Sequence, residues 1–281
     1  MTHPTRLVLL GSPVAHSLSP TFQNAALDIA GLPVRYEALD VPAAQLDDML
    51  ARLALEGAAG NVTVPHKIAV HDRCSVLTPS ARRAGAVNTF WFSDGTLHGD
   101  NTDVGGFTAA VTALVGSDPL PRSLILIGAG GAAAGVCTAA EQWGASSISV
   151  VARSRGAAHR LAARFPDLVT ISDSLPADDV LGSARTRRAQ RETSPLLVVN
   201  ATPLGISGDD PLPVAIAELP AQSLVLDLVY ARGETRFVRE ARAAGHRAAD
   251  GLTMLLEQGA LAFERWFGFA PDRDAMRRSV E

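Results

Sequence analysis

Lysine occurs once in this chain, at Lys67. Lysine and arginine together number 25, so the other 24 are arginines. Arginine keeps its proton in a protein, whereas a partly desolvated lysine can exchange one near neutral pH. Arginine serves solubility and surface salt bridges equally well. The single amine is therefore a candidate proton-transfer group. The alternative is that a coding bias towards arginine left one lysine by chance.

The chain also contains a glycine-rich run of the kind that binds nucleotide phosphates. The run consists of Gly128, Ala129, Gly130, Gly131 and Ala132. It follows an apolar predicted strand at 123–127 and opens a helix of small residues. Glycines in this context permit a tight turn and a close approach of the backbone to a pyrophosphate, and the helix N-terminus offers unpaired N–H groups. A glycine-rich turn that binds nothing is the alternative.

The residues after the next predicted strand indicate which dinucleotide would bind. Ala152-Arg153-Ser154-Arg155 follow the strand at 148–151 and include no carboxylate. A site for NAD usually has Asp or Glu here to accept a hydrogen bond from the ribose 2′-hydroxyl, whereas an arginine can pair with a 2′-phosphate. The sequence therefore favours NADP over NAD, with an ordinary exposed arginine as the alternative.

Composition narrows the class of protein. Hydrophobic residues make up 47% of the 281 and charged residues 19%, which is typical of a globular chain with a real core. The net charge of -4 gives no general attraction to nucleic acid or anionic membranes, and no apolar stretch reaches the roughly 18 residues of a membrane span. Cys74 and Cys137 have no metal-type spacing, and the N-terminus lacks a signal-peptide apolar region. We expect a cytoplasmic protein with no metal, nucleic acid or membrane partner.

Strands and helices alternate in the first part of the chain, which predicts a mostly parallel sheet. Strands are predicted at 7–10, 35–39 and 60–64, and helices at 19–29 and around 46–53. Ser19-Pro20 resembles an N-cap followed by proline at the first helical position. The stretches 86–92 and 96–100, joined by Asp94-Gly95, predict a β-hairpin.

A second series of alternating elements follows a helix predicted at 103–115. The proline- and glycine-rich stretch 116–121 is the most linker-like part of the chain. Beyond it, strands are predicted at 123–127, 148–151, 196–199 and 224–228, and a last helix at 252–267. The arginine-rich segment 182–195 has no apolar periodicity, so it is read as a solvated insertion, with a recognition patch as the alternative.

Seven segments in order resemble the motifs of the shikimate dehydrogenase family. They are 11–20 (GSPVAHSLSP), 61–67 (NVTVPHK), 85–89 (GAVNT), 99–103 (GDNTD), 200–205 (NATPLG), 227–230 (DLVY) and 250–260 (DGLTMLLEQGA). The likeness covers nearly the whole chain. It departs in two places: Ala152 stands where the family often has asparagine, and the 182–195 segment is longer than usual.

The resemblance implies an α/β protein of two domains. Residues 1–103 would form a substrate-binding catalytic domain with a mostly parallel sheet, to which 252–281 return as helices that pack against it. Residues 104–251 would form a Rossmann-type NADP-binding domain. The implied activity is the NADP-dependent reduction of 3-dehydroshikimate to shikimate, on the route to aromatic amino acids. The protein would be a monomer or a homodimer.

The resemblance also implies roles for individual residues. Lys67 and Asp103 would be the catalytic pair. The substrate would be held by Ser17, Ser19, Thr63, Asn88, Tyr230 and Gln258. The cofactor would be held by Gly128, Ala129, Gly130, Gly131, Ala132, Arg153, Ser154, Leu228 and Gly251. His16 and His66 receive no chemical role, and which member of the catalytic pair carries the proton at each step stays open.

Two kinds of alternative remain at the level of sequence. A member of the same family could act on quinate or an amino-shikimate, and it could use NAD. A catalytically silent paralogue could bind nucleotide and serve as a regulator or scaffold, although the presence of both Lys67 and Asp103 argues against it.

Overall fold

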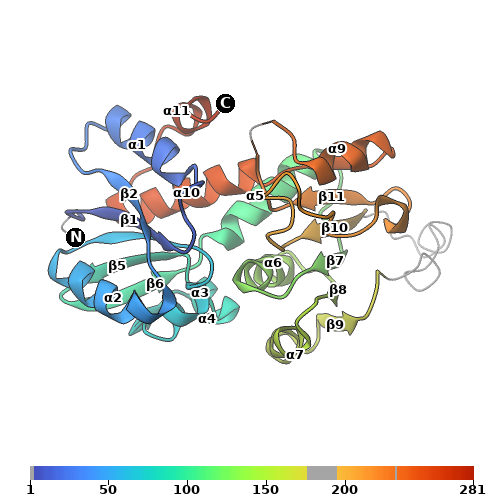
Figure 1. The fold of residues 1–281 in the computed structure, drawn as a ribbon, viewed down its shortest axis with the longest axis horizontal. Coiled ribbons are helices and arrows are strands. Elements are labelled where there is room, and N and C mark those ends of the chain that lie inside the picture. The colour runs from blue at the N-terminus through green and yellow to red at the C-terminus, as the bar shows by residue number, and fades with distance from the viewer. Residues whose placement is uncertain (1–2, 176–194, 232) are drawn as a thin grey trace. The chain divides into compact units, whose positions relative to one another are not determined.

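The computed structural model describes residues 3–175, 195–231 and 233–281 (Figure 1). The chain forms two compact units, Met1–Gly106 with Leu255–Glu281, and Phe107–Met254. The proline- and glycine-rich stretch at 116–121 lies inside the second unit, so the linker prediction is wrong. The chain passes between the units within two helices instead, α5 (Asp103–Val115) and α10 (Leu252–Phe267).

The first unit contains a mixed six-stranded sheet in the order β2-β1-β3-β5-β6-β4. Its strands are β1 (Leu7–Gly11), β2 (Tyr36–Asp40), β3 (Ala59–Val62), β4 (Val76–Leu77), β5 (Thr89–Ser93) and β6 (Thr96–Asp100). The β1–β2, β1–β3 and β4–β6 pairs are parallel, whereas β5 is antiparallel to both neighbours because it belongs to the predicted hairpin. The hairpin turn has positive φ angles at Asp94 and Gly95, as a two-residue turn of this sequence requires.

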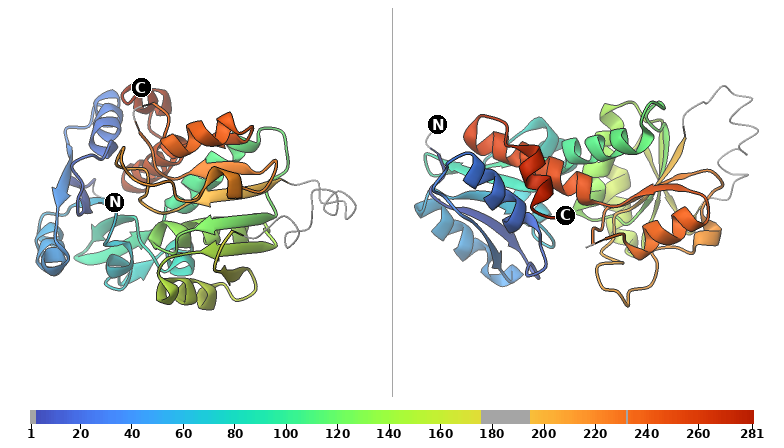
Figure 2. Two further views of the ribbon diagram at one scale, coloured as in Figure 1. Left: turned by 45° about the vertical axis from the view of Figure 1, so that its right-hand side comes forward. Right: turned by 90° about the horizontal axis from the view of Figure 1, so that it is seen from above.

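Helices cover this sheet and enclose an apolar core. They are α1 (Ser19–Ile29), η1 (Ala43–Gln45), α2 (Leu46–Leu55), α3 (Lys67–His71), α4 (Pro79–Ala84), α11 (Arg273–Arg278) and this unit's parts of α5 and α10. Leu10, Leu53, Val62 and Phe90 are at most 2% exposed and pack in one cluster. The C-terminal α11 contacts α1 (Figures 1 and 2), which confirms that the end of the chain returns to the first unit.

The N-cap of α1 and the end of β3 differ from the prediction. The N-cap of α1 is Leu18, which offers no side-chain bond, and Ser19 is already helical. The hydroxyl that satisfies the helix start is Ser17 Oγ, which accepts a hydrogen bond from Ser19 N at 3.2 Å. Strand β3 ends at Val62 rather than at 64, because the chain turns there, with His66 N donating to Thr63 O at 2.9 Å across a cis Val64–Pro65 bond.

The second unit contains a six-stranded sheet whose strands are all parallel. The order is β12-β11-β10-β7-β8-β9, that of a doubly wound dinucleotide-binding fold. The strands are β7 (Ser123–Ile127), β8 (Ser147–Val151), β9 (Val169–Ser172), β10 (Leu196–Asn200), β11 (Leu224–Asp227) and β12 (Arg247–Ala249). The described helices within it are α6 (Gly131–Gln142), α7 (Arg155–Arg164), η2 (Ile216–Glu218) and α9 (Arg236–Ala243).

The strand order reverses between β7 and β10, and ligands of such sheets bind beyond the carboxyl ends of the strands at that point. Buried Ile125, Val198 and Val225 of the sheet pack with Phe237 and Val238 of α9. No helix among the described residues is long and apolar enough to cross a membrane. Residues 182–194 of the arginine-rich segment lie outside the described residues.

Candidate active site

Lys67 and Asp103 form an ion pair in the first unit. Lys67 Nζ lies 2.6 Å from Asp103 Oδ2, and the two side chains are only 14% and 6% exposed. Each residue is the first of its helix, α3 and α5. The ammonium is therefore bound by a carboxylate and largely shielded from water. This is the partly desolvated environment that a proton-transfer lysine requires.

Asn88 forms a hydrogen bond with the other oxygen of the Asp103 carboxylate. Its Nδ2 donates to Asp103 Oδ1 at 2.9 Å and to Gln258 Oε1 at 3.1 Å. Its Oδ1 accepts from the main-chain N–H of Thr102 at 2.7 Å, and because an N–H can only donate, this bond fixes which way the amide faces. Gln258 in turn donates to Leu255 O at 2.7 Å. Four predicted residues from distant parts of the sequence, Lys67, Asn88, Asp103 and Gln258, are thus brought together.

A buried polar network behind Asn88 was missed by sequence reasoning. Asn61 Nδ2 donates to Asn88 O and to Thr89 Oγ1, both at 3.0 Å, and Asn61 Oδ1 accepts from Tyr36 Oη at 2.8 Å. The Thr89 and Thr102 hydroxyls lie 3.0 Å apart and both contact Asn88 Oδ1. The available signal was a polar side chain, Asn61, in a strand that is otherwise made of apolar residues and glycine. The network holds Asn88 at both its main chain and its amide.

Three further predicted residues present hydroxyls in the first unit. Ser17 Oγ is engaged by Ser19 N, as described above. Within the described part of the chain, the hydroxyls of Ser19 and Thr63 make no hydrogen bond. Gly11 allows the loop after β1 to approach Thr63, because a Cβ there would lie 2.3 Å from Thr63 Cγ2. Ser12 N also donates to Val64 O at 3.0 Å, so the serine loop and the Thr63 turn are held together.

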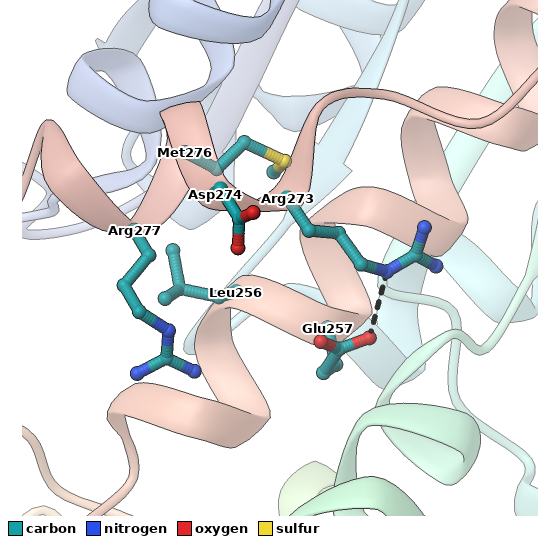
Figure 3. Close-up of a pocket in the computed structure, with 6 residues that line it drawn as sticks. All are labelled: Leu256, Glu257, Arg273, Asp274, Met276 and Arg277. Atoms are coloured by element: carbon teal, nitrogen blue, oxygen red, sulfur yellow. Dashed lines mark hydrogen bonds and ion pairs between the residues drawn. The ribbon is translucent and has the colours of Figure 1, made fainter.

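A cavity of about 220 Å³ lies elsewhere in this unit, between α10 and α11 (Figure 3). It is lined by Leu256, Glu257, Arg273, Asp274, Met276 and Arg277. Arg273 is bound by Glu257 at 3.1 Å and by Glu264 at 2.9 Å, so its charge is already matched. None of the lining residues belongs to the Lys67 cluster, and this cavity is not the candidate active site.

The glycine run of the second unit has the shape of a phosphate cradle. Gly128 has φ +110°, and a Cβ there would lie 2.9 Å from Ala201 O on the neighbouring strand end. Gly130 is the N-cap of α6, and a Cβ on it would meet nothing within 4 Å. The first helical N–H to bond back is that of Ala134, to Gly130 O. Open space therefore faces the start of a 12-residue helix, which fits a dinucleotide pyrophosphate.

The residues after β8 carry unmatched positive charge. Ser154 caps α7, its Oγ accepting from Ala157 N at 3.4 Å. Arg155 pairs with Asp173, whereas Arg153 has no ion pair or hydrogen bond from its side chain among the described residues. A free guanidinium beside a serine hydroxyl fits the 2′-phosphate of NADP.

The later motifs meet at the carboxyl ends of β10 and β11. Asn200 Nδ2 donates to Asp227 Oδ1 at 2.8 Å, and Asp227 Oδ2 accepts from Thr235 Oγ1 at 2.8 Å. Burial raises the pKa of the Asp227 carboxyl above its ordinary value. Gly251 packs on the chain after β11, since a Cβ there would lie 2.3 Å from Leu228 O. Tyr230 is half-buried three residues beyond β11, in the second unit.

The cysteines take no part in these clusters. Neither forms a disulfide; Cys137 is buried and Cys74 is half-buried. Burial raises the pKa of the Cys74 thiol to about 12, so it is a poor nucleophile. No group of three potential metal ligands occurs among the side chains that the structure describes. His66 is buried, and its Nε2 lies 2.6 Å from Val41 O, so the ring helps to pack the first unit.

Comparison with known proteins gives matches over the full chain. Residues 9–90 match the family model described as "Shikimate dehydrogenase substrate binding domain", and 251–281 match "Shikimate 5'-dehydrogenase C-terminal domain". The chain is 41% identical over 279 residues to shikimate dehydrogenase (NADP(+)) of Methylocella silvestris, covering 98% of this chain and 95% of that one.

Solved structures agree in fold over nearly the same length. A shikimate 5-dehydrogenase from Thermus thermophilus, in complex with NADP(H) and shikimate, has a TM-score of 0.80 and 37% identity, covering 98% of each chain. A quinate dehydrogenase from Corynebacterium glutamicum, in complex with NAD, has a TM-score of 0.81 at 28% identity, covering 98% of this chain and 97% of that one.

Proposed function

The chain belongs to the shikimate dehydrogenase family, and from that premise we propose how its residues carry out the NADP-dependent reduction of 3-dehydroshikimate to shikimate. The protein is an oxidoreductase that uses NADP. The single observation that carries the proposal is the Lys67–Asp103 pair, held at 2.6 Å and largely shielded from water.

Lys67 is the residue that moves the proton. Reduction of the ketone leaves an alkoxide oxygen, and Lys67 Nζ donates a proton to it; in the reverse direction the amine takes that proton from the hydroxyl. NADPH, when bound, supplies the hydride. Both oxygens of Asp103 accept from N–H donors, Lys67 and Asn88, so the orientation of this carboxylate is fixed. Its role is to hold the ammonium in place.

The substrate is a polyhydroxylated ring acid, and short polar side chains suit it. Asn88 and Gln258 present amide groups beside the catalytic pair. Ser17, Ser19, Thr63 and Tyr230 present hydroxyls. The unpartnered Ser19 and Thr63 hydroxyls support this assignment, because groups left without a protein partner can bond a ligand without first breaking an internal bond.

The cofactor is assigned to the second unit. Gly128, Ala129, Gly130, Gly131 and Ala132 hold the pyrophosphate at the start of α6. Arg153 and Ser154 hold the 2′-phosphate, and Leu228 and Gly251 line the cofactor at the carboxyl ends of β11 and β12. The open space at Gly130 and the free guanidinium of Arg153 support these roles.

The functional domains follow from these assignments. Residues 1–103 with 252–281 serve as the substrate domain and 104–251 as the cofactor domain. Cysteines that form no disulfide are typical of a cytoplasmic protein. The protein acts on small molecules as a monomer or a homodimer.

A four-way assay tests the function. Purified protein is given shikimate or quinate, each with NADP or NAD, and cofactor reduction is followed. We expect the highest kcat/KM with shikimate and NADP. Faster turnover of quinate, or preference for NAD, would contradict the substrate or cofactor assignment respectively, and the similarity to the Corynebacterium glutamicum enzyme makes the quinate–NAD combination the most informative rival.

A further inference from the structure

The carboxyl edge of the second sheet carries an acidic residue close to the proposed 2′-phosphate site. Strands β8 and β9 are parallel neighbours, and their last paired residues are Val151 and Ser172 (Figure 1). The next residues along the two strands are Ala152 and Asp173. Asp173 therefore lies one strand away from the segment that contains Arg153, at the same edge of the sheet.

Arg155 reaches across to this acid. It is the first residue of α7, and its Nη2 donates to Asp173 Oδ1. The two side chains are 61% and 76% exposed. The guanidinium thus lies at the carboxyl edge, where ligands of doubly wound sheets bind, rather than along the outer face of the helix.

Of the two arginines in this segment, only Arg153 can bind a phosphate without first breaking an ion pair. Arg153 has no ion pair or side-chain hydrogen bond among the described residues, whereas the charge of Arg155 is matched by Asp173. The net charge offered to a phosphate by these three side chains is therefore that of one cation, although two arginines are present.

We propose that Asp173 is a cofactor-specificity determinant that lowers the affinity of this protein for the 2′-phosphate of NADP. It does so by holding Arg155 and by adding a negative charge at the same edge. The proposal rests on the proposed function, in which Arg153 and Ser154 receive that phosphate.

The energies are compatible with this role. An ion pair between exposed side chains contributes little to stability, so a doubly charged phosphate can compete with Asp173 for Arg155. A carboxylate at this edge repels a phosphate but can accept a hydrogen bond from the 2′-hydroxyl of NAD. Asp173 therefore reduces the preference of the protein for NADP over NAD. Because the Asp173 side chain is exposed, replacing it should not affect folding.

Fragments of the cofactor test the proposal without any need for turnover. Adenosine 2′,5′-bisphosphate carries the 2′-phosphate and 5′-AMP lacks it, and the Kd of each is measured by calorimetry. We expect Asp173→Asn to lower the Kd for the bisphosphate about threefold to tenfold and to leave that for 5′-AMP within about twofold, as befits one charge near a partly solvated site. Arg155→Gln should raise the Kd for the bisphosphate, and the double variant should return it close to the wild-type value.

Asp118→Asn is the matched control, because Asp118 also pairs with an exposed arginine, Arg247, but at the amino end of β12. It should change neither Kd. An unchanged or higher Kd for the bisphosphate in Asp173→Asn, or an equal gain for both fragments, would overturn the proposal. Arg153→Gln distinguishes a failure of the proposed NADP site from a failure of the proposed role of Asp173. If wild type does not prefer the bisphosphate and Arg153→Gln changes neither Kd, the NADP site is misassigned and the role of Asp173 is wrong as well.

Discussion

The carboxylate of Asp103 is shared between two donors that have different tasks. Lys67 binds Oδ2 and Asn88 binds Oδ1, so the orientation of the carboxylate is set by an amide that is itself fixed by the Thr102 N–H. Such preorganisation matters because a displacement of about 1 Å can cost about a hundredfold in rate. The carboxylate that holds Lys67, the proposed proton-transfer group, is thus positioned before substrate arrives.

Gly251 is a residue whose replacement should be costly for a purely steric reason. A Cβ at this position would lie 2.3 Å from the carbonyl oxygen of Leu228, which is main chain and cannot rotate away. We expect Gly251→Ala to lower the free energy of unfolding by about 2 kcal/mol and to weaken NADP binding. Urea unfolding and calorimetry would measure both.

Gly208→Ala is the control, because a Cβ at Gly208 meets nothing within 4 Å. Equal stability of the two variants would mean that Gly251 is not closely packed against the chain after β11.

At the scale of elements, an ion pair joins α10 to β6, the strand that precedes Asp103 of the proposed catalytic pair. Arg265 Nε and Nη2 both donate to Asp100 Oδ2, at 3.0 and 2.7 Å, and Asp100 is the last residue of β6. The Asp100 side chain is 8% exposed and that of Arg265 is 46% exposed. Gln258 lies on the same helix, two turns before Arg265, so this ion pair helps to place the amide that is proposed to bind substrate.

Arg265→Gln should leave a buried carboxylate without its cation. We expect the free energy of unfolding to fall by about 2 kcal/mol, below the roughly 3–5 kcal/mol found for fully buried pairs because Arg265 is half exposed. Adding Asp100→Asn should restore part of the loss. Arg247→Gln, which breaks an exposed pair, should cost less than about 1 kcal/mol. Equal losses of unfolding free energy in Arg265→Gln and Arg247→Gln would show that the pair with buried Asp100 contributes no more than an exposed pair.

The elements themselves were largely predictable from sequence, and the contacts between distant elements were not. The hairpin at Asp94-Gly95 and the helix after Gly130 follow from local backbone requirements, so local sequence reports them. The helix α1 was predicted with its observed bounds, but its N-cap was placed at Ser19 instead of Leu18, because composition does not show that the hydroxyl of Ser17 accepts from Ser19 N. The Asn61 network depends on which strands become neighbours, and the Arg265–Asp100 pair depends on which helix packs beside β6. No local pattern encodes either. The Lys67, Asn88, Asp103 and Gln258 cluster was predicted through ordered motifs.

At the scale of the whole molecule, stability should depend on pH through an acid that is buried in the second unit. Asp227 is fully buried, and burial raises the pKa of its carboxyl above the ordinary value of about 4. A raised pKa in the folded state means that the folded protein binds this proton more tightly than the unfolded chain. The resulting stabilisation is complete below about pH 4 and is lost as the pH rises through the folded-state pKa.

Asp227→Asn should remove that dependence. The asparagine can keep the bonds, with Oδ1 accepting from Asn200 and Nδ2 donating to Thr235 Oγ1. We expect the variant to gain stability relative to wild type as the pH is raised from about 4 to 7, measured as the difference in unfolding free energy in urea. Asp118→Asn, at an exposed position, serves as the control. A difference that stays constant or shrinks with rising pH would contradict the raised pKa.

Proton transfer by Lys67 is tested most directly by replacing the lysine with arginine. Lys67→Arg keeps the positive charge beside Asp103 but removes the ability to release a proton. With shikimate and NADP, we expect kcat to fall by about a hundredfold or more, while the Kd for NADP stays within about twofold of wild type. A variant that turned over at close to the wild-type rate would contradict the proton-transfer role, because charge alone would then suffice at this position.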